Sequence, residues 1–274
     1  QLIESGSMMM NGGQFAWFVT EFVSGETLSQ RIIRDDNISV YDIKVIAKAV
    51  LSALSFLHSQ PTPIIHNEVT IQNVLLNLTA GFQDLKLIDF GNACFLDQHP
   101  VKLHLNEFNP FYLAPERFSG VSSVQADLYS VGVMMYHLLY GKLPWFVDVS
   151  RQKEQDAIDR ILLERDKELD LPNDNRYELD NQLLNTIAKA LCYDIEERFQ
   201  TADEFIKAIE GEEKIEKKST RRKILSHNYT SGKEMPKPQK TKGLGFAAIA
   251  GMDELKSQLV EEVIGRLHNR EEYR

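Results

Sequence analysis

The polar residues best suited to chemistry are Glu68, Asn73 and Asp89, which lie close together in the sequence. Two short apolar segments, residues 73–77 and 85–88, predict a pair of neighbouring β-strands in the same stretch. A hairpin of these strands would hold a polar loop at one end and a carboxylate suited to a metal ion at the other. Both ends would then reach the same bound molecule.

The spacing of these residues matches a series of motifs. In chain order the series is His-Asn-Glu at 66–68, Asn73, Asp-Phe-Gly at 89–91, Ala-Pro-Glu at 114–116 and Asp-Leu-Tyr-Ser-Val-Gly at 127–132. An isolated Asp-Phe-Gly is a weak signal, whereas the ordered series is specific. It resembles the protein kinase family over roughly residues 1–210. The resemblance implies an α+β fold, with a mostly helical large lobe and part of a small lobe.

The resemblance assigns roles to the polar residues. Asn73 and Asp89 would bind Mg²⁺, and Glu68 would replace the catalytic aspartate that orients the acceptor hydroxyl. ATP and Mg²⁺ are therefore the expected cofactors, and a serine or threonine of a protein is the expected acceptor. From the residues alone, Glu68 is either a working base or a solvated carboxylate. His66 is more simply a structural residue, which in the family packs beneath Phe90.

The resemblance also predicts a nucleotide site. Thr20 would gate the back of the adenine pocket, and the backbone from Glu21 to Val23 would form hydrogen bonds with adenine. Glu26 would reach the ribose, and Leu75 would pack on the adenine ring. Without the resemblance, the aromatic and β-branched segment before Val23 reads as a plain buried edge strand and Leu75 as a core residue.

Four residues near the acceptor site depart from the family pattern. The positions that usually carry Arg, Asp, Lys and Thr hold Asn67, Glu68, Thr70 and Asn109. The side chain of Glu68 is one methylene longer than aspartate, which would displace the acceptor hydroxyl by about an ångström and slow transfer by about 10²-fold. Because both metal ligands are retained, we expect nucleotide binding with impaired phosphate transfer.

The segment between Gly91 and Ala114 contains no Ser or Thr, and its only hydroxyl belongs to Tyr112. In kinases the arginine at the position of Asn67 usually binds a phosphate on this segment. The phosphate acceptor and its arginine are thus absent together, so we expect no activation by Ser/Thr phosphorylation here.

The remaining patterns predict the elements that position these residues. Apolar spacing and a capping Ser39 predict a helix over 39–59. Further helices are expected at 127–140, 152–166, 180–192 and 201–210. By resemblance, Glu116 would form a buried pair with Arg198, and Asp127 would brace the catalytic loop.

Composition limits the class of protein. The chain is 43% apolar and 26% charged, as in ordinary globular proteins, and no apolar run approaches 18 residues. We therefore expect no membrane span, a cytoplasmic location and reduced thiols at Cys94 and Cys192. The sequence also begins at Gln1 without a signal peptide or the kinase glycine-rich loop and strand lysine, so we expect part of a longer chain that transfers little phosphate by itself.

The net charge of −9 is unevenly spread, with about −15 over residues 1–213, +8 over 214–242 and −2 over 243–274. The acidic part argues against a nucleic-acid surface. The basic stretch also holds Pro, Gly, Ser and Thr, so we interpret it as a solvated linker in preference to a polyanion site.

These patterns predict four segments. They are the end of the small lobe and the hinge at 1–25, the large lobe at 26–210, a basic linker at 211–242 and the start of a further module at 243–274. Residues 245–260 resemble the opening of an AAA+ ATPase module, in which a glycine turn leads into a helix. The alternative is a generic amphipathic helix after a linker.

Two functions remain open. The first is a Ser/Thr protein kinase that binds ATP and Mg²⁺, with an impaired catalytic loop, fused to an AAA+ ATPase. The second is a pseudokinase that serves as a nucleotide-responsive or scaffolding regulator of the attached AAA+ module. A small-molecule kinase of related fold is a weaker third, because such relatives usually lack Ala-Pro-Glu.

Overall fold

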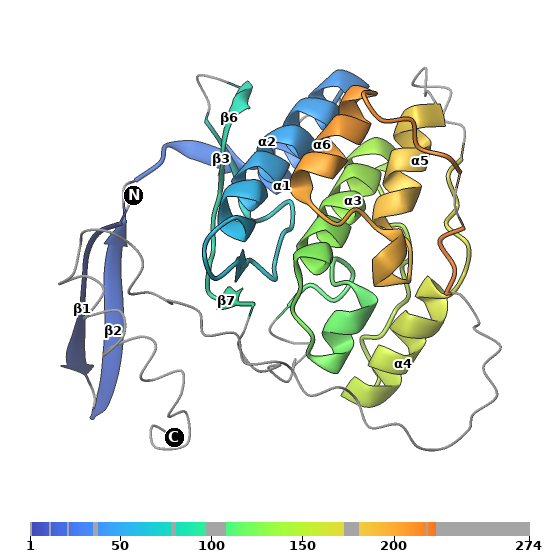
Figure 1. Cartoon of the computed structure of the whole chain (residues 1–274). Coiled ribbons are helices and arrows are strands. Elements are labelled where there is room, and N and C mark those ends of the chain that lie inside the picture. Colours follow the sequence, from blue (N-terminus) through green and yellow to red (C-terminus); the bar gives the residue numbers. More distant parts are fainter. Residues whose placement is uncertain are drawn as a thin grey trace. The chain divides into compact units, whose positions relative to one another are not determined.

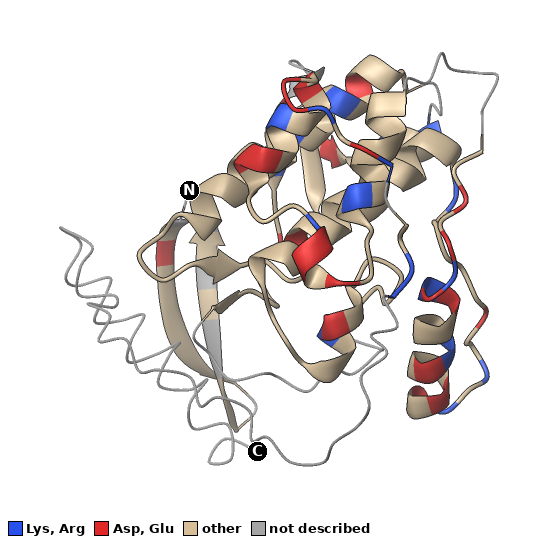
Figure 2. Cartoon of the chain, turned by 45° about the vertical axis from the view of Figure 1, so that its right-hand side comes forward, with Lys and Arg blue, Asp and Glu red and all other residues tan. Residues whose placement is uncertain are grey.

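The structure is a computed structural model that describes residues 2–10, 12–20, 22–34, 38–77, 81–96, 108–172, 181–217 and 219–222 (Figure 1). The chain divides into two units, and their described parts end at Ser24 and begin at Gly25. The fold is α+β, with strands first and helices after them, as the sequence predicted. Figure 2 shows acidic and basic positions interspersed over the helices.

The N-terminal unit contains a two-stranded antiparallel ribbon. Its strands are β1 (Leu2–Met10) and β2 (Gly13–Thr20). Gly12 lies in the connecting turn with a φ of 79°, a backbone conformation that favours glycine. Gly6 faces Trp17, where an added Cβ would lie 2.8 Å from the indole ring. The strand expected in the aromatic and β-branched segment before Val23 is confirmed as β2.

Five strands form two small sheets in the large unit. They are β3 (Gly25–Thr27), β4 (Ile64–Ile65), β5 (Val74–Asn77), β6 (Gly81–Leu87) and β7 (Cys94–Phe95). The first sheet has the order β3-β5-β6, and β4 pairs with β7. The predicted hairpin is therefore confirmed as β5 and β6. The strands β3, β4 and β7 were not predicted, because two or three residues show no period.

The helices surround a core that runs along α3. They are α1 (Leu28–Arg34), α2 (Val40–His58), α3 (Val124–Tyr140), α4 (Glu154–Arg165), α5 (Asn181–Ala190) and α6 (Ala202–Glu210), with 3₁₀ turns η2 (Pro115–Ser119) and η3 (Ile195–Glu197). Ser39 caps α2 in a reciprocal box with Asp42, as its sequence indicated. The N-cap of α3 is Ser123, so this helix begins three residues before the predicted start. The short helix α1 was not predicted.

Burial on α3 extends almost around the whole helix, because α2 and α5 both pack against it. α2 also packs against α6, and Figure 1 shows α2, α6 and α3 side by side. Gly132 permits close approach of α5, since an added Cβ would lie 2.8 Å from Cβ of Ala190. The helix α3 also carries Asp127, which contacts the polar loop of residues 66–73.

Within the described part of the chain, no helix is long and apolar enough to cross a membrane. The expected linker spans residues 211–242, but in its described part, residues 211–217 and 219–222, Ile215 and Thr220 are buried. The stretch expected to open an AAA+ module, residues 243–274, lies outside the described residues.

Candidate functional site

A buried carboxylate holds the loop that carries Glu68. Asp127, which is 1% exposed, accepts hydrogen bonds from the backbone N–H groups of His66 and Asn67, each at 2.8 Å. The Nε2 atom of His58 lies 3.0 Å from the same carboxylate. The predicted brace between Asp127 and the loop is confirmed, and His58 is a partner that spacing did not reveal.

Asn67 lies in a left-handed backbone conformation with a φ of 66°. Asparagine tolerates this region better than most residues. Its buried side-chain Nδ2 donates to the carbonyl oxygen of Asn92 at 3.0 Å and to Sγ of Cys94 at 3.2 Å. A neutral amide thus ties the loop to β7.

The carboxylate of Glu68 is positioned by a residue that sequence reasoning missed. Nδ2 of Asn92 donates a hydrogen bond of 2.8 Å to Oε2 of Glu68. Asn92 directly follows Asp-Phe-Gly, which is the only signal that could have pointed to it. The side chain of Asn109 accepts a hydrogen bond within its own turn, from the N–H of Phe111 at 3.2 Å.

The two candidate metal ligands stand at adjacent strand ends. The N–H of Ile88 donates to the carbonyl oxygen of Asn73 at 2.9 Å, so Asp89 follows directly beside Asn73. Asp89 is exposed and has a φ of 63°, and its Oδ1 accepts from the N–H of Gly91 at 3.1 Å. Nδ2 of Asn73 donates to the carbonyl oxygen of Glu68 at 2.9 Å. The loop and the hairpin therefore present these groups together.

These groups suit Mg²⁺. Within the described residues, no group donates to Oδ1 of Asn73, so this oxygen is available as a ligand together with the carboxylate of Asp89. No cluster of three or more His, Cys, Asp or Glu side chains that could hold a metal occurs in the same residues. Mg²⁺ commonly takes one or two protein oxygens and completes its shell with phosphates and water. The donor set fits a metal that arrives with a nucleotide.

His66, in the polar loop, is packed against the Asp-Phe-Gly turn. The rings of His66 and Phe90 lie 4.8 Å apart between centroids, and Nε2 of His66 lies 3.2 Å from the carbonyl oxygen of Ile88. His66 is fully buried. Its predicted packing against Phe90 is confirmed, and this contact holds the Asp-Phe-Gly turn against the loop.

The predicted nucleotide contacts fall in both units. In the large unit, Leu75 lies on β5 opposite Thr27, and Glu26 forms an ion pair of 2.5 Å with Arg34. Glu26 is thus already engaged by an exposed guanidinium.

In the N-terminal unit, Thr20 ends β2 and pairs with Leu2, and Val23 lies between β2 and β3. Glu21 lies outside the described residues. The roles of these three residues therefore stay predictions.

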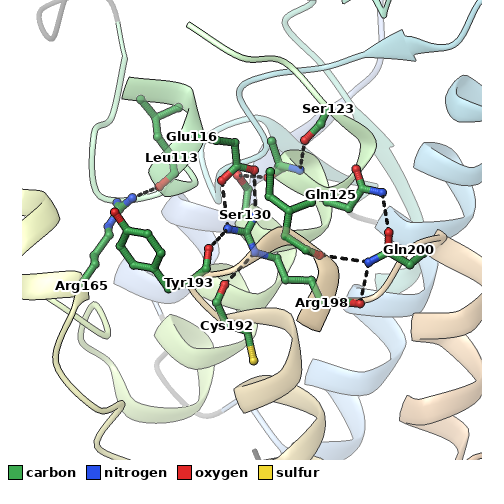
Figure 3. Close-up of polar contacts among 12 residues, drawn as sticks. Leu113, Glu116, Ser123, Gln125, Ser130, Arg165, Cys192, Tyr193, Arg198 and Gln200 are labelled. Atoms are coloured by element: carbon green, nitrogen blue, oxygen red, sulfur yellow. Dashed lines mark hydrogen bonds and ion pairs between the residues drawn. The ribbon is translucent and has the colours of Figure 1, made fainter. Parts of the chain in front are cut away.

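The C-terminal end of the segment between Gly91 and Ala114 is closely packed. The hydroxyl of Tyr112 lies 2.7 Å from Nδ1 of His137, and burial raises the pKa of this tyrosine. Burial also lowers the pKa of His137, which favours the neutral ring. The buried guanidinium of Arg165 donates to the carbonyl oxygen of Leu113 (Figure 3). It also donates to the carbonyl oxygen of Pro110 at 2.7 Å. The one hydroxyl of this segment is therefore withdrawn from solvent.

A buried ion pair anchors η2. Arg198 donates two parallel hydrogen bonds to the carboxylate of Glu116, at 2.8 and 2.9 Å (Figure 3). It also donates to the carbonyl oxygens of Cys192 and Tyr193, both at 2.7 Å. The predicted pairing of Glu116 and Arg198 is confirmed. It fixes Ala-Pro-Glu to the segment between α5 and α6.

Comparisons with known proteins agree with this geometry. The chain matches the protein kinase domain over residues 2–209. It is 27% identical over 80% of its length to a probable serine/threonine-protein kinase PknB of Lactococcus lactis, and 26% identical over 67% to a putative serine/threonine-protein kinase of Mycoplasma genitalium. It is 32% identical over 49% to serine/threonine-protein kinase tousled-like 1 of Caenorhabditis elegans. The chain covers 34%, 50% and 15% of these three proteins.

Proposed function

Because this chain belongs to the protein kinase family, we propose that it binds ATP with Mg²⁺ and transfers phosphate slowly to a serine or threonine of a protein. The observation that carries the proposal is the adjacency of three groups. The loop of Glu68 is bonded to Asn73, and Asn73 is bonded to the strand end that carries Asp89. The proposed base and the two proposed metal ligands are therefore linked through Asn73.

Asn73 and Asp89 would hold Mg²⁺, and Leu75 would contact adenine. Thr20, Glu21 and Val23 would take the nucleotide-binding roles that the family resemblance implies. Mg²⁺ bound with ATP would neutralise phosphate charge during transfer. Asn73 would give its amide oxygen, because its Nδ2 is held by the loop carbonyl. Asp89 would give a carboxylate oxygen, whose direction is fixed by its turn.

Glu68 would orient the acceptor hydroxyl and receive its proton. The amide of Asn92 fixes one carboxylate oxygen and leaves the other for the acceptor. This hydrogen bond would orient the carboxylate of Glu68 but would not correct the extra length of the glutamate side chain. We therefore expect slow transfer. Glu26 forms an ion pair with Arg34, so it would contact ribose only after this ion pair breaks.

A second candidate is a pseudokinase that binds the nucleotide without transferring phosphate. One observation favours it. Thr70, at the position of the usual phosphate-binding lysine, is 2% exposed and carries no charge. This loop position therefore supplies no positive side chain to the transferring phosphate.

Thermal unfolding with and without Mg·ATP tests the nucleotide site in either case. We expect Mg·ATP to raise the melting temperature and Asp89→Ala to abolish the increase. Without nucleotide this variant should melt at a slightly lower temperature, because alanine tolerates the positive φ of residue 89 less well than aspartate. Asp148→Ala, at another exposed turn, is the matched control. A shift that persists in Asp89→Ala would contradict the assignment of the metal ligand.

We also propose that residues 211–242 connect the kinase domain to an AAA+ ATPase module that begins at 243. The glycine turn and the apolar spacing of residues 245–260 support it. The natural full-length protein should then hydrolyse ATP even when Asp89 is replaced by alanine. Hydrolysis that is lost completely in this variant would contradict the proposal.

A further inference from the structure

The chain continues beyond α6 as a packed segment, residues 213–217 and 219–222, which we call the strap. In Figure 1 it is the orange trace beside α5, and Figure 2 shows positions of both charge signs along it. Gln182 on α5 bonds to the backbone of Glu213 and Ile215, and Asn185 donates to the carbonyl oxygen of Ile215 at 2.9 Å. The strap lies beyond the matched kinase domain, which ends at residue 209.

One carboxylate holds the far end of the strap. Glu168 accepts hydrogen bonds from Oγ of Ser219 at 2.7 Å and from the N–H of Thr220 at 3.0 Å. Thr220 is 1% exposed, and its Oγ1 accepts from the N–H of Leu169 at 2.8 Å. Its carbonyl oxygen accepts from the N–H of Tyr193 at 2.9 Å. Release of Glu168 would therefore break a linked set of bonds.

The charge of Glu168 favours this attachment. Burial acts to raise its pKa, but the hydrogen bonds from Ser219 and Thr220 outweigh burial, and the pKa lies below its usual value. The carboxylate is therefore ionised near neutral pH. Arg221 adds a weak exposed ion pair with it, at 3.6 Å.

Ser219 itself is exposed, and basic residues surround it in the sequence Lys-Lys-Ser-Thr-Arg-Arg-Lys. Ser219 also lines a cavity of about 510 Å³, together with Leu169, Ala188 and Lys217. The hydroxyl is thus open to a modifying enzyme and has space beside it. Flanking cations suit an enzyme with an acidic peptide-binding surface.

We propose that Ser219 is a phosphorylation site, and that its phosphate repels Glu168 and releases the strap from the large unit. A protein kinase that prefers basic sequences would transfer the γ-phosphoryl group of Mg·ATP to Oγ of Ser219. The Oγ–P bond forms, the bond between phosphorus and the oxygen of ADP breaks, and the hydroxyl proton leaves. The proposal does not depend on phosphate transfer by this chain itself.

The physical effect follows from charge. Phosphoserine carries a charge of about −1.5 to −2 at neutral pH. The carboxylate of Glu168 accepts a hydrogen bond from Oγ of Ser219. Phosphorylation of this oxygen would remove the donor and place a second negative charge beside the carboxylate. It would also compete with Glu168 for Arg221. These changes all weaken the attachment of Thr220.

The first arm of the test asks whether Ser219 is an acceptor. The 274-residue chain with Asp89→Ala, which removes its own transfer, is incubated with Mg·ATP and a kinase that prefers basic sequences, and the phosphate is mapped by mass spectrometry. We expect phosphate at Ser219 and none there in Ser219→Ala. Incorporation that leaves Ser219 unmodified would overturn the acceptor assignment.

The second arm asks whether the phosphate releases the strap, with phosphoserine incorporated genetically at 219. Hydrogen exchange at the amides of Leu169, Tyr193 and Thr220 reports attachment, and we expect it to accelerate about tenfold or more. Ser219→Ala, which removes one hydrogen bond without adding charge, should change these rates less than about threefold. Equal rates in the two variants, or slower exchange with phosphoserine, would overturn the release.

Discussion

Glu68 and Asn92 come from two different segments, and their side chains meet in a hydrogen bond of 2.8 Å. The bond restrains a glutamate that is longer than the aspartate of most kinases. An orienting bond of this kind matters for rate, because a displaced base loses its alignment with the acceptor. Asn92 is therefore a positioning residue for the proposed reaction.

Asn92→Ala should lower kcat by about tenfold to a hundredfold and leave KM for ATP unchanged. Asn92→Asp would place two carboxylates together, which raises the pKa of the pair and moves the acidic limb of the pH–rate profile to higher pH. Asn185→Ala, on α5, is the matched amide control and should retain full activity. An unchanged kcat and pH profile in both Asn92 variants would show that the bond is only structural.

His137 predicts how stability responds to acid. Its pKa is lowered by burial in the folded protein, so the unfolded chain binds a proton more readily. Stability should therefore be complete above the unfolded value of about 6.5 and fall as the pH drops from there towards the lowered folded value. Urea unfolding at several pH values measures this, and His137→Gln should flatten the curve of stability against pH below about pH 6.5. If the free energy of unfolding depends on pH in the same way in His137→Gln, the loss of stability in acid does not come from His137.

At the scale of elements, the close contact of α3 with α5 depends on a glycine, Gly132, which has no side chain. Gly132→Ala should destabilise the protein by about 1–3 kcal/mol, because the new Cβ would lie 2.8 Å from Cβ of Ala190. Ser52→Ala, on the exposed face of α2, is a small-residue control. Chemical denaturation measures both variants. A neutral Gly132→Ala would mean that α5 shifts freely, contrary to the tight packing described.

The ion pair of Glu116 and Arg198 joins η2 to the segment after α5. Arg198→Ala should cost about 3–5 kcal/mol, because it leaves Glu116 without its partner and removes the donors to two carbonyl oxygens. Arg198→Lys should rescue only part of this loss, since lysine lacks the two-pronged geometry. Thermal unfolding of the two variants compares them. Equal stability of Arg198→Lys and the natural protein would exclude a role for that geometry.

At the scale of the whole molecule, the sequence was sufficient for the α+β fold, the main helices and the pairing of Glu116 with Arg198, because long apolar periods and ordered motifs carry that information. It could not reveal the bond of Asn92 to Glu68, because Asn92 belongs to none of these motifs. The packed strap was missed for a similar reason. A basic composition indicates a linker, and only tertiary contacts show that Thr220 is buried.

The most direct test of the proposed function is transfer of labelled γ-phosphate from ATP into protein, measured with the natural full-length protein and Mg²⁺. Counting label in protein excludes plain ATP hydrolysis. We predict slow labelling that is lost in both Asp89→Ala and Glu68→Ala, while Glu164→Ala, at an exposed pair with Lys167, retains it. Absence of labelling in the natural protein, together with stabilisation by Mg·ATP that requires Asp89, would contradict transfer and establish a nucleotide-binding pseudokinase.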